Sequence, residues 1–189
     1  SLTISSRTVT RYIRSLPNKK SPGYDGIPNE ILKHLQDSLA YPLSLLFNIS
    51  LSSGIFPSAW KYALVVPIYK RKGCRSDATN YRPISPLCCI SKLFERIVYD
   101  QLYRHLSPYL HTMQSGFRRG DSTALHLVHL IQNIMQSRHL KEHTGMCFFD
   151  LAKAFDTVWH RGLIAKLGAY GIGGNLLCFL EGYLTGRLQ

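Results

Sequence analysis

Asp150 is the residue whose position most clearly suggests chemistry, because it directly follows the apolar run Met146–Phe149. A carboxylate is costly to bury at the end of such a run unless it is paired or bound to a cation. At the end of a central strand it can hold Mg²⁺, which takes oxygen ligands and bridges nucleotide phosphates to a reacting oxygen. The alternative is that Asp150 only caps the next turn. Asp156, six residues later, is interpreted as a helix cap rather than a ligand.

Positive charge is concentrated in the middle third of the chain. The 189 residues hold 23 Lys and Arg against 11 Asp and Glu, a formal net charge of +12. Residues 61–119 contain 11 of these cations and 3 of the acids, with tyrosines interspersed. This pattern is typical of a surface for a polyanion such as nucleic acid or a polyphosphate. A solvated basic face is the alternative.

The composition is that of a folded protein. Hydrophobic residues make up 45% of the chain, and 11 Tyr and 8 Phe can build a core, which excludes a disordered basic tail. No stretch approaches the roughly 18 apolar residues of a membrane span. We therefore expect a soluble, intracellular protein without a membrane partner, in the nucleus or the cytoplasm. Five cysteines without a C-x-x-C pair indicate neither a disulfide framework nor a zinc ribbon.

Hydrophobic periodicity predicts mainly helices. The segments with helical spacing or helix-initiating residues are 8–16, 28–35, 39–51, 90–104, 122–135, 156–167 and 175–184. We expect segments 90–104 and 122–135 to be amphipathic helices that face the core. Glu95 falls on the polar side of the first of these two helices.

Strands are predicted at fewer places. The run Tyr62–Lys70 is typical of a strand that leads into a basic turn, with Pro67 at an edge or a bulge. Residues 81–83 are expected to be extended, and 146–149 to form a short apolar strand. This order of elements favours the α+β class.

Four blocks of the sequence, in order, resemble the reverse transcriptases of non-LTR (LINE-type) retrotransposons. FFDLAKAFDTVWH is similar to the first catalytic motif of that family, and SPGYDGIPNEILK to its N-terminal finger motif. PIYKRKGCRSDATNYRPISPLCCISKLFERIV is similar to its fingers motif, and QSGFRRGDSTALHLVHLI to the block before the catalytic aspartate. The resemblance runs from about Arg11 to Gln189. It implies a right-hand polymerase fold, with a fingers region over residues 1–143 and a partial palm over 144–189.

The resemblance also implies roles for single residues. Asp150 matches the metal-binding catalytic aspartate, and the carbonyl of Leu151 would lie beside the same metal. Phe155 matches the aromatic residue under the incoming sugar that discriminates against a 2′-hydroxyl; ordinary core packing is the alternative. Arg82 matches the finger arginine on the incoming triphosphate, and Lys70 is a plausible second phosphate contact, because cations neutralise transferring phosphoryl oxygens. For both cations the alternative is a surface salt bridge.

A further block matches residues that lie along the template-primer in this family. Its members here are Gln114, Gly116, Phe117 and Arg118, and Arg119 is expected to add only backbone electrostatics. The implied activity is RNA-directed DNA polymerisation, the transfer of a nucleotide from a dNTP to a DNA 3′ end. The implied cofactor is a pair of Mg²⁺ ions, and the implied partners are an RNA template and a DNA primer. Nothing in the sequence indicates a homo-oligomer.

The carboxylates of the expected two-metal site are incomplete in this sequence. Family members continue with a Pro-Gln-Gly motif and a hairpin bearing Asp-Asp, whereas no Asp follows Asp156 here and no two Asp are adjacent. We therefore expect a fragment truncated before that hairpin, which is inactive alone. Two other hypotheses remain open: a non-catalytic nucleic-acid-binding module and a remnant without function.

Overall fold

The computed structural model describes residues 2–18 and 22–188 and divides the chain into two compact units. Unit 1 comprises Ser1–His105 and Trp159–Gln189, and unit 2 comprises Leu106–Val158. Lys19 and Lys20 of the predicted N-terminal loop, Ser21 at the start of the finger motif, and Gln189 lie outside the described residues. The predicted division at residues 143 and 144 stays a prediction.

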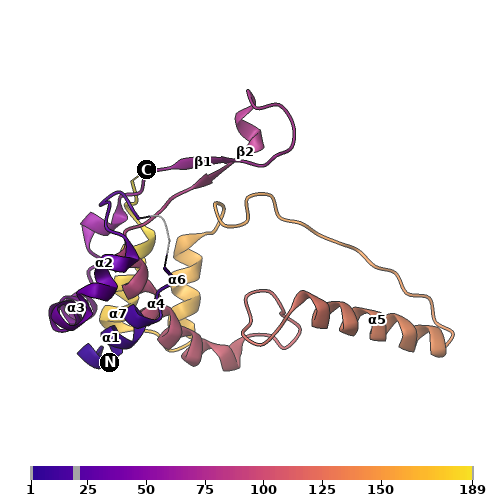
Figure 1. Cartoon of the computed structure of the whole chain (residues 1–189). Coiled ribbons are helices and arrows are strands. Elements are labelled where there is room, and N and C mark those ends of the chain that lie inside the picture. Colours follow the sequence, from indigo (N-terminus) through magenta and orange to yellow (C-terminus); the bar gives the residue numbers. More distant parts are fainter. Residues whose placement is uncertain (1, 19–21, 189) are drawn as a thin grey trace. The chain divides into compact units, whose positions relative to one another are not determined.

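Unit 1 is a group of helices from both ends of the sequence (Figure 1). Its helices are α1 (Ser6–Arg14), α2 (Asn29–His34), α3 (Gln36–Ser53), α4 (Cys89–Leu106), α6 (His160–Ala169) and α7 (Gly174–Leu184), with the 3₁₀ turn η1 (Ser58–Lys61) after α3. Local signals explain several helix ends. The Ser5 hydroxyl accepts a hydrogen bond from the Thr8 amide at the start of α1. Gly54 ends α3 in the left-handed region, at φ 71°.

Aromatic side chains form the centre of unit 1. Phe94 of α4 and Phe47 of α3 are both fully buried and stack with ring centroids 4.3 Å apart. Trp60 of η1 lies edge-on to both rings, and Phe179 of α7 packs against Phe94 at 5.3 Å. Such pairs add to the free energy gained by burying apolar area. The predicted core-facing helix 90–104 is therefore confirmed as α4.

The sheet in the described residues is a single antiparallel hairpin in unit 1. Strand β1 (Val66–Tyr69) pairs with β2 (Tyr81–Ile84) in the register Val66↔Ile84, Pro67↔Pro83, Ile68↔Arg82 and Tyr69↔Tyr81. Pro67 lies in an edge strand, as predicted, because β1 has β2 as its neighbour. The loop between the strands contains the 3₁₀ turn η2 (Ala78–Asn80). A helix-rich chain with one small sheet agrees with the predicted α+β class.

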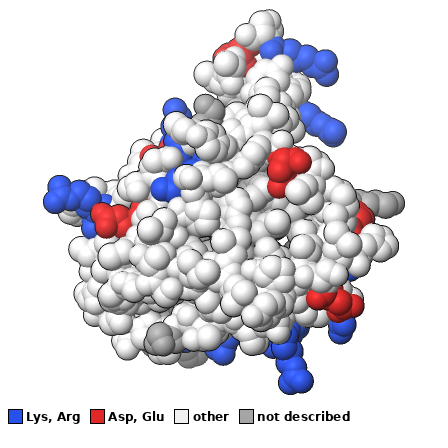
Figure 2. Space-filling model, turned by 90° about the vertical axis from the view of Figure 1, so that its left-hand side faces the viewer, with Lys and Arg blue, Asp and Glu red and all other residues white. Residues whose placement is uncertain are grey.

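One face of unit 1 carries few charged side chains. Figure 2 shows this face, over α3, with lysine and arginine projecting at the margins and at the top, where the hairpin lies. In α3 itself, Tyr41, Leu45 and Ile49 are exposed apolar or aromatic residues at one-turn spacing. Within the ranges that the structure describes, no helix is both long and apolar enough to cross a membrane.

Unit 2 contains the 3₁₀ turn η3 (Ser107–Tyr109) and the helix α5 (Thr123–His139). Ser122 caps α5 by accepting a hydrogen bond from the Leu125 amide, so the predicted start of this helix is confirmed. The prediction that this helix faces the core was wrong, because α5 has no buried residue and Ile131 is 55% exposed. The remainder of unit 2 provides no second helix or sheet against which the apolar face of α5 could pack.

Two predictions between residues 146 and 160 were also wrong. The segment 146–149 forms no strand, and Phe148 and Phe149 are 81% and 90% exposed. A strand needs a neighbour for its backbone hydrogen bonds, and the paired strands described in this chain pair only with each other. Asp156 is not a helix cap, because α6 begins at His160, after Trp159. The Asp156 amide instead donates to the Lys153 carbonyl in a turn.

Candidate nucleotide and nucleic-acid site

The two residues predicted to contact a triphosphate lie on the hairpin of unit 1. Arg82 is exposed on β2 and pairs with Ile68 in the strand register, so both side chains are on the same face. Lys70 directly follows β1, and its ammonium donates a hydrogen bond of 2.7 Å to the Thr79 carbonyl. This contact holds the Lys70 stem across the loop. It leaves two ammonium hydrogens for other acceptors.

Hydrogen bonds within the hairpin give its basic loop a defined shape. The Asp77 carboxylate accepts from the amide and the hydroxyl of Thr79 at 2.8 and 2.7 Å, and these bonds, with a smaller effect of Lys70, lower the pKa of Asp77. The Tyr81 hydroxyl donates to the Arg75 carbonyl at 2.9 Å. Four exposed cations thereby project from a loop with one acid; they are Lys70, Arg71, Lys72 and Arg75. This arrangement can neutralise a polyphosphate.

The residues predicted to follow the template lie in a loop of unit 2. Gln114 donates from its side-chain amide to the Gly116 carbonyl at 3.3 Å, and Arg118 donates to the Ser107 carbonyl at 3.1 Å. Phe117 has φ 61° and is 83% exposed, so its ring projects from the loop. Arg119, also exposed, is next in the chain. The loop therefore presents an aromatic ring beside cationic groups.

One pair of predicted site residues comes together in unit 2. The Phe155 ring lies 5.9 Å from the Phe117 ring in an edge-to-face arrangement at 90°. Phe155 is 78% exposed, so its predicted alternative of core packing was wrong in this structure. Residues that were assigned to the incoming sugar and to the template-primer block are therefore neighbours.

Asp150 and Leu151 lie in an irregular, exposed segment of unit 2. In the ranges 2–18 and 22–188, no group of three or more His, Cys, Asp and Glu could hold a metal ion. Mg²⁺ commonly takes one or two protein carboxylates and completes its shell with water and phosphate. Asp150 can supply one such oxygen ligand, but the described residues do not by themselves form a two-metal site.

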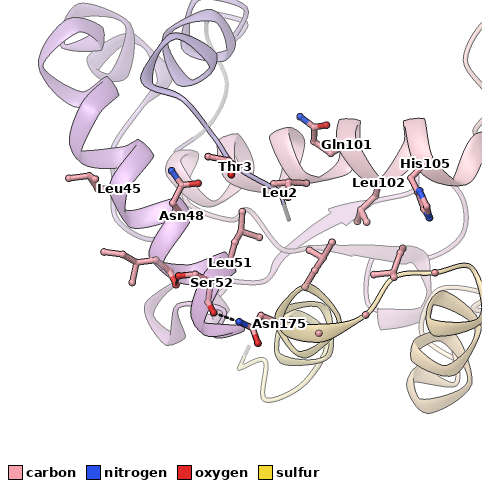
Figure 3. Close-up of a pocket in the computed structure, with 16 residues that line it drawn as sticks. Leu2, Thr3, Leu45, Asn48, Leu51, Ser52, Gln101, Leu102, His105 and Asn175 are labelled. Carbon is pink, nitrogen blue, oxygen red and sulfur yellow. Dashed lines mark hydrogen bonds between the residues drawn. The ribbon is translucent and has the colours of Figure 1, made fainter.

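A larger cavity in unit 1, of about 1220 Å³, is bounded by the N-terminal segment, α3, α4 and the α6–α7 loop (Figure 3). Three of its polar side chains, Asn48, His105 and Asn175, contact the backbone of the protein itself. Asn48 donates to and accepts from the backbone of Ile4 at 2.8 Å, and His105 lies 2.7 Å from the Tyr170 carbonyl. Asn175 donates to the Ser52 carbonyl. These contacts hold the walls of the cavity together, and we assign no ligand to it.

The sequence also matches known proteins. Residues 68–188 match the family model described as reverse transcriptase (RNA-dependent DNA polymerase). The chain belongs to the reverse transcriptase family. A probable RNA-directed DNA polymerase from transposon BS of Drosophila melanogaster is 38% identical over 161 residues, which is 84% of this chain and 18% of that protein. The RNA-directed DNA polymerase from mobile element jockey of Drosophila funebris is 32% identical over 186 residues, which is 97% of this chain and 20% of that protein.

The predicted resemblance to the LINE-type reverse transcriptases is therefore confirmed. This reverse transcriptase chain spans about a fifth of the length of these relatives. Arg82 and Lys70 belong to unit 1, whereas Asp150 and the template block belong to unit 2. The structure thus places the predicted triphosphate contacts together in unit 1, and Phe117 beside Phe155 in unit 2. A single site that combines the residues of both units stays a prediction.

Sequence reasoning missed a polar cluster between α4 and the C-terminal segment of this reverse transcriptase chain. Glu95, predicted on the solvent side of its helix, is half-buried and accepts hydrogen bonds from the hydroxyls of Ser91, at 2.8 Å, and Tyr183, at 3.2 Å. Burial raises the pKa of Glu95, against the opposing effects of Ser91, Arg187 and Tyr183. Arg187 lies over the Tyr183 ring at 4.2 Å. The spacing of Ser91 and Glu95, one helical turn, was the available signal.

Proposed function

We propose that this chain contributes the triphosphate-binding hairpin and the first metal-binding aspartate of an RNA-directed DNA polymerase. The enzyme transfers a nucleotide from a dNTP to the 3′ end of a DNA primer on an RNA template. In this proposal residues 1–143 form the fingers and residues 144–189 the first part of the palm of a right-hand fold. The observation that carries the proposal is the ordered β1–β2 hairpin, with Arg82 on a strand and Lys70 at the start of a loop of exposed cations.

The hairpin has the chemistry that a triphosphate needs. A guanidinium can bind two phosphate oxygens at once, so Arg82 supplies both charge and orientation. Lys70 is a point charge whose position is limited by its bond to the Thr79 carbonyl. Because charge is spread over the phosphoryl oxygens during transfer, fixed cations stabilise the transition state more than mobile ones.

Asp150 would hold Mg²⁺ together with the carbonyl of Leu151 and the phosphates of the dNTP. When bound, the metal neutralises phosphate charge and favours the nucleophilic form of the primer 3′ oxygen. The chain's own part is to present one carboxylate at the end of an apolar segment. A second carboxylate would have to come from residues other than those described here.

Phe155 is proposed to lie against the sugar of the incoming nucleotide, with Phe117 supporting it through their edge-to-face contact. Gln114, Gly116 and Arg118 would then follow the template-primer in the same unit, and Arg119 would add charge toward its backbone. An RNA template, a DNA primer and a dNTP are intracellular, so we propose an intracellular location.

Nucleotide binding by the purified 189-residue chain tests this proposal. Titration of dTTP into Arg82→Gln should show at least a tenfold weaker affinity than wild type, since a hydrogen bond to a charged group contributes about 1.5–3 kcal/mol. Arg161→Gln, an exposed arginine on α6, should bind as wild type does. Equal affinities of wild type and Arg82→Gln would contradict the proposal. Binding of RNA without any binding of dTTP would favour the non-catalytic module instead.

A further inference from the structure

A second cavity in unit 1, of about 470 Å³, lies between α4 and α7. Buried apolar side chains form its interior; they are Val98, Phe179 and Leu180. Lys92, Arg96 and Tyr99 of α4 also line it, and Tyr99 is 47% exposed and so lies toward the opening. An apolar interior with an aromatic wall and cations near the entrance suits a flat ring that carries a negative group.

Positive charge continues from this cavity toward α1. The Arg96 guanidinium lies 5.9 Å from the Tyr12 ring, and the Arg11 guanidinium lies 5.3 Å from the same ring. Two acids of α4 lie near these cations: Asp100 accepts a hydrogen bond of 2.5 Å from the Tyr12 hydroxyl, and Glu95, which lines the cavity, accepts from Ser91 and Tyr183. The exposed Arg104 follows Asp100 one turn later on α4. Hydroxyl groups of the protein therefore bind both carboxylates, whereas Arg11, Arg96 and Arg104 are exposed to solvent.

Aromatic rings accompany these cations along α4. The rings of Tyr99 and Tyr103, one helical turn apart, lie 5.8 Å from each other with an angle of 35° between their planes. Rings at this spacing, among arginines, are what a strand of unpaired nucleotides requires, because bases stack on aromatic faces while phosphates meet cations. A duplex keeps its bases stacked and paired, so it does not offer separate flat rings to this surface.

We infer that this surface, formed by Arg11, Tyr12, Lys92, Arg96, Tyr99, Tyr103 and Arg104 and called here the α4 surface, binds single-stranded nucleic acid. One base enters the 470 Å³ cavity beside Tyr99, where Glu95 and Tyr183 offer polar atoms to its edge. The phosphates on either side of that base lie on Lys92, Arg96 and Arg104. None of these residues belongs to the groups assigned above to the triphosphate, the metal or the template block.

The inference rests on nucleic acid as the partner of the proposed function but not on catalysis. RNA and DNA single strands share the phosphate and base chemistry that the α4 surface recognises, so both are used as probes. The experiment measures binding of fluorescein-labelled oligouridylate and oligothymidylate of roughly 16 nucleotides to the 189-residue chain, by anisotropy, over a series of salt concentrations. Far-UV circular dichroism and thermal melting verify the fold of each variant.

Tyr99→Ala should weaken binding about tenfold, because stacking on an aromatic ring contributes that much per base. An oligomer of the same length without bases should bind wild type and Tyr99→Ala equally. The double variant Arg96→Gln, Arg104→Gln should reduce the slope of log K against log salt by roughly 1.4, for two lost phosphate contacts. The matched control for the ring is Tyr41→Ala on α3, which should keep the wild-type affinity. The matched control for the charges is Arg161→Gln with Lys166→Gln on α6, which should keep the wild-type salt slope.

The control variant Arg161→Gln with Lys166→Gln could reduce the salt slope as much as Arg96→Gln with Arg104→Gln does. That result would overturn the inference, because binding would then depend on net charge alone. Equal binding of polyglutamate at the same salt would overturn it in favour of an acidic peptide. Photocrosslinking of wild type with 4-thiouridine RNA gives a readout that needs no variant, and we expect adducts within residues 92–103. Adducts only within residues 66–84 would overturn the α4 surface while keeping the proposed hairpin function. No binding of either strand would contradict both.

Discussion

Substitution of Phe94 is the most direct test of the aromatic packing that holds α4 against α3, η1 and α7. The Phe94 ring is fully buried, stacks on Phe47 at 4.3 Å and meets Trp60 and Phe179 edge-on at 5.8 and 5.3 Å. Truncation of a buried Phe to Ala costs about 3–5 kcal/mol. Phe94→Leu keeps most of the volume but loses three aromatic pairs, each worth about 0.5–1.5 kcal/mol beyond area. We therefore expect Phe94→Leu to lower the free energy of unfolding by about 2–3 kcal/mol.

Urea denaturation followed by tryptophan fluorescence measures this effect, because Trp60 is itself in the cluster. The midpoint should fall while the slope of free energy against urea is unchanged. A protein of ordinary stability has about 5–15 kcal/mol, so the variant should still fold. Phe148→Leu is the matched control, since Phe148 is 81% exposed. A loss below about 0.5 kcal/mol for Phe94→Leu, or an equal loss for Phe148→Leu, would refute the reasoning.

Three further predictions concern unit 1. Burial raises the pKa of Glu95, so near and above the ordinary glutamate pKa of about 4.3 the folded chain binds more protons than the unfolded chain. The free energy of unfolding should therefore fall as the pH rises from about 4.3 to the raised pKa of Glu95. Glu95→Gln should flatten this fall in the urea midpoints, and a pH profile equal to that of wild type would contradict the prediction. Iodoacetamide should modify exposed Cys74, whose pKa is lowered by hydrogen bonds with Ser76, well before Cys88 and Cys89, whose pKa values burial raises, as peptide mass spectrometry can show. Gly54→Ala should lower the melting temperature, since residue 54 has φ 71° and a Cβ there would lie 3.0 Å from the Asn175 carbonyl oxygen; an unchanged melting temperature would argue against this helix end.

The hairpin and most helices of unit 1 could be predicted because their signals are local. A β-branched run before a basic turn, followed by the extended Tyr81–Pro83, was enough for β1 and β2. The identities of Arg82 and Lys70 as candidate phosphate contacts came from the family motif. The bond between the Lys70 ammonium and the Thr79 carbonyl could not be predicted, because it depends on how the loop closes.

Glu95 shows why polarity is an incomplete guide to the outside of a helix. Glu95 was predicted to face solvent because it is charged and lies outside the apolar stripe of its helix. The hydroxyl of Tyr183, 88 residues later in the sequence, instead donates a hydrogen bond to the Glu95 carboxylate. Burial of a carboxylate is tolerated where hydrogen-bond donors replace water. The α4 surface combines both kinds of information. The proximity of the Tyr99 and Tyr103 rings follows from helix geometry, whereas the cavity beside them requires α7.

Two of the errors in unit 2, the exposed α5 and the missing strand at 146–149, have a common physical cause. The periodicity of α5 and the apolar run before Asp150 indicate which side chains are apolar, but they do not indicate which other element could cover those side chains. Helix α5 keeps its predicted start because a cap is made by neighbouring residues, whereas a strand at 146–149 requires a hydrogen-bonding partner that the described residues of unit 2 do not supply. The local capping signal of α5 is therefore fulfilled, whereas the two predictions that depend on a second element are not. The position of Asp150 at the end of a strand is a prediction of the second kind, so the catalytic role proposed for Asp150 would depend on a pairing partner that the described residues of unit 2 do not supply.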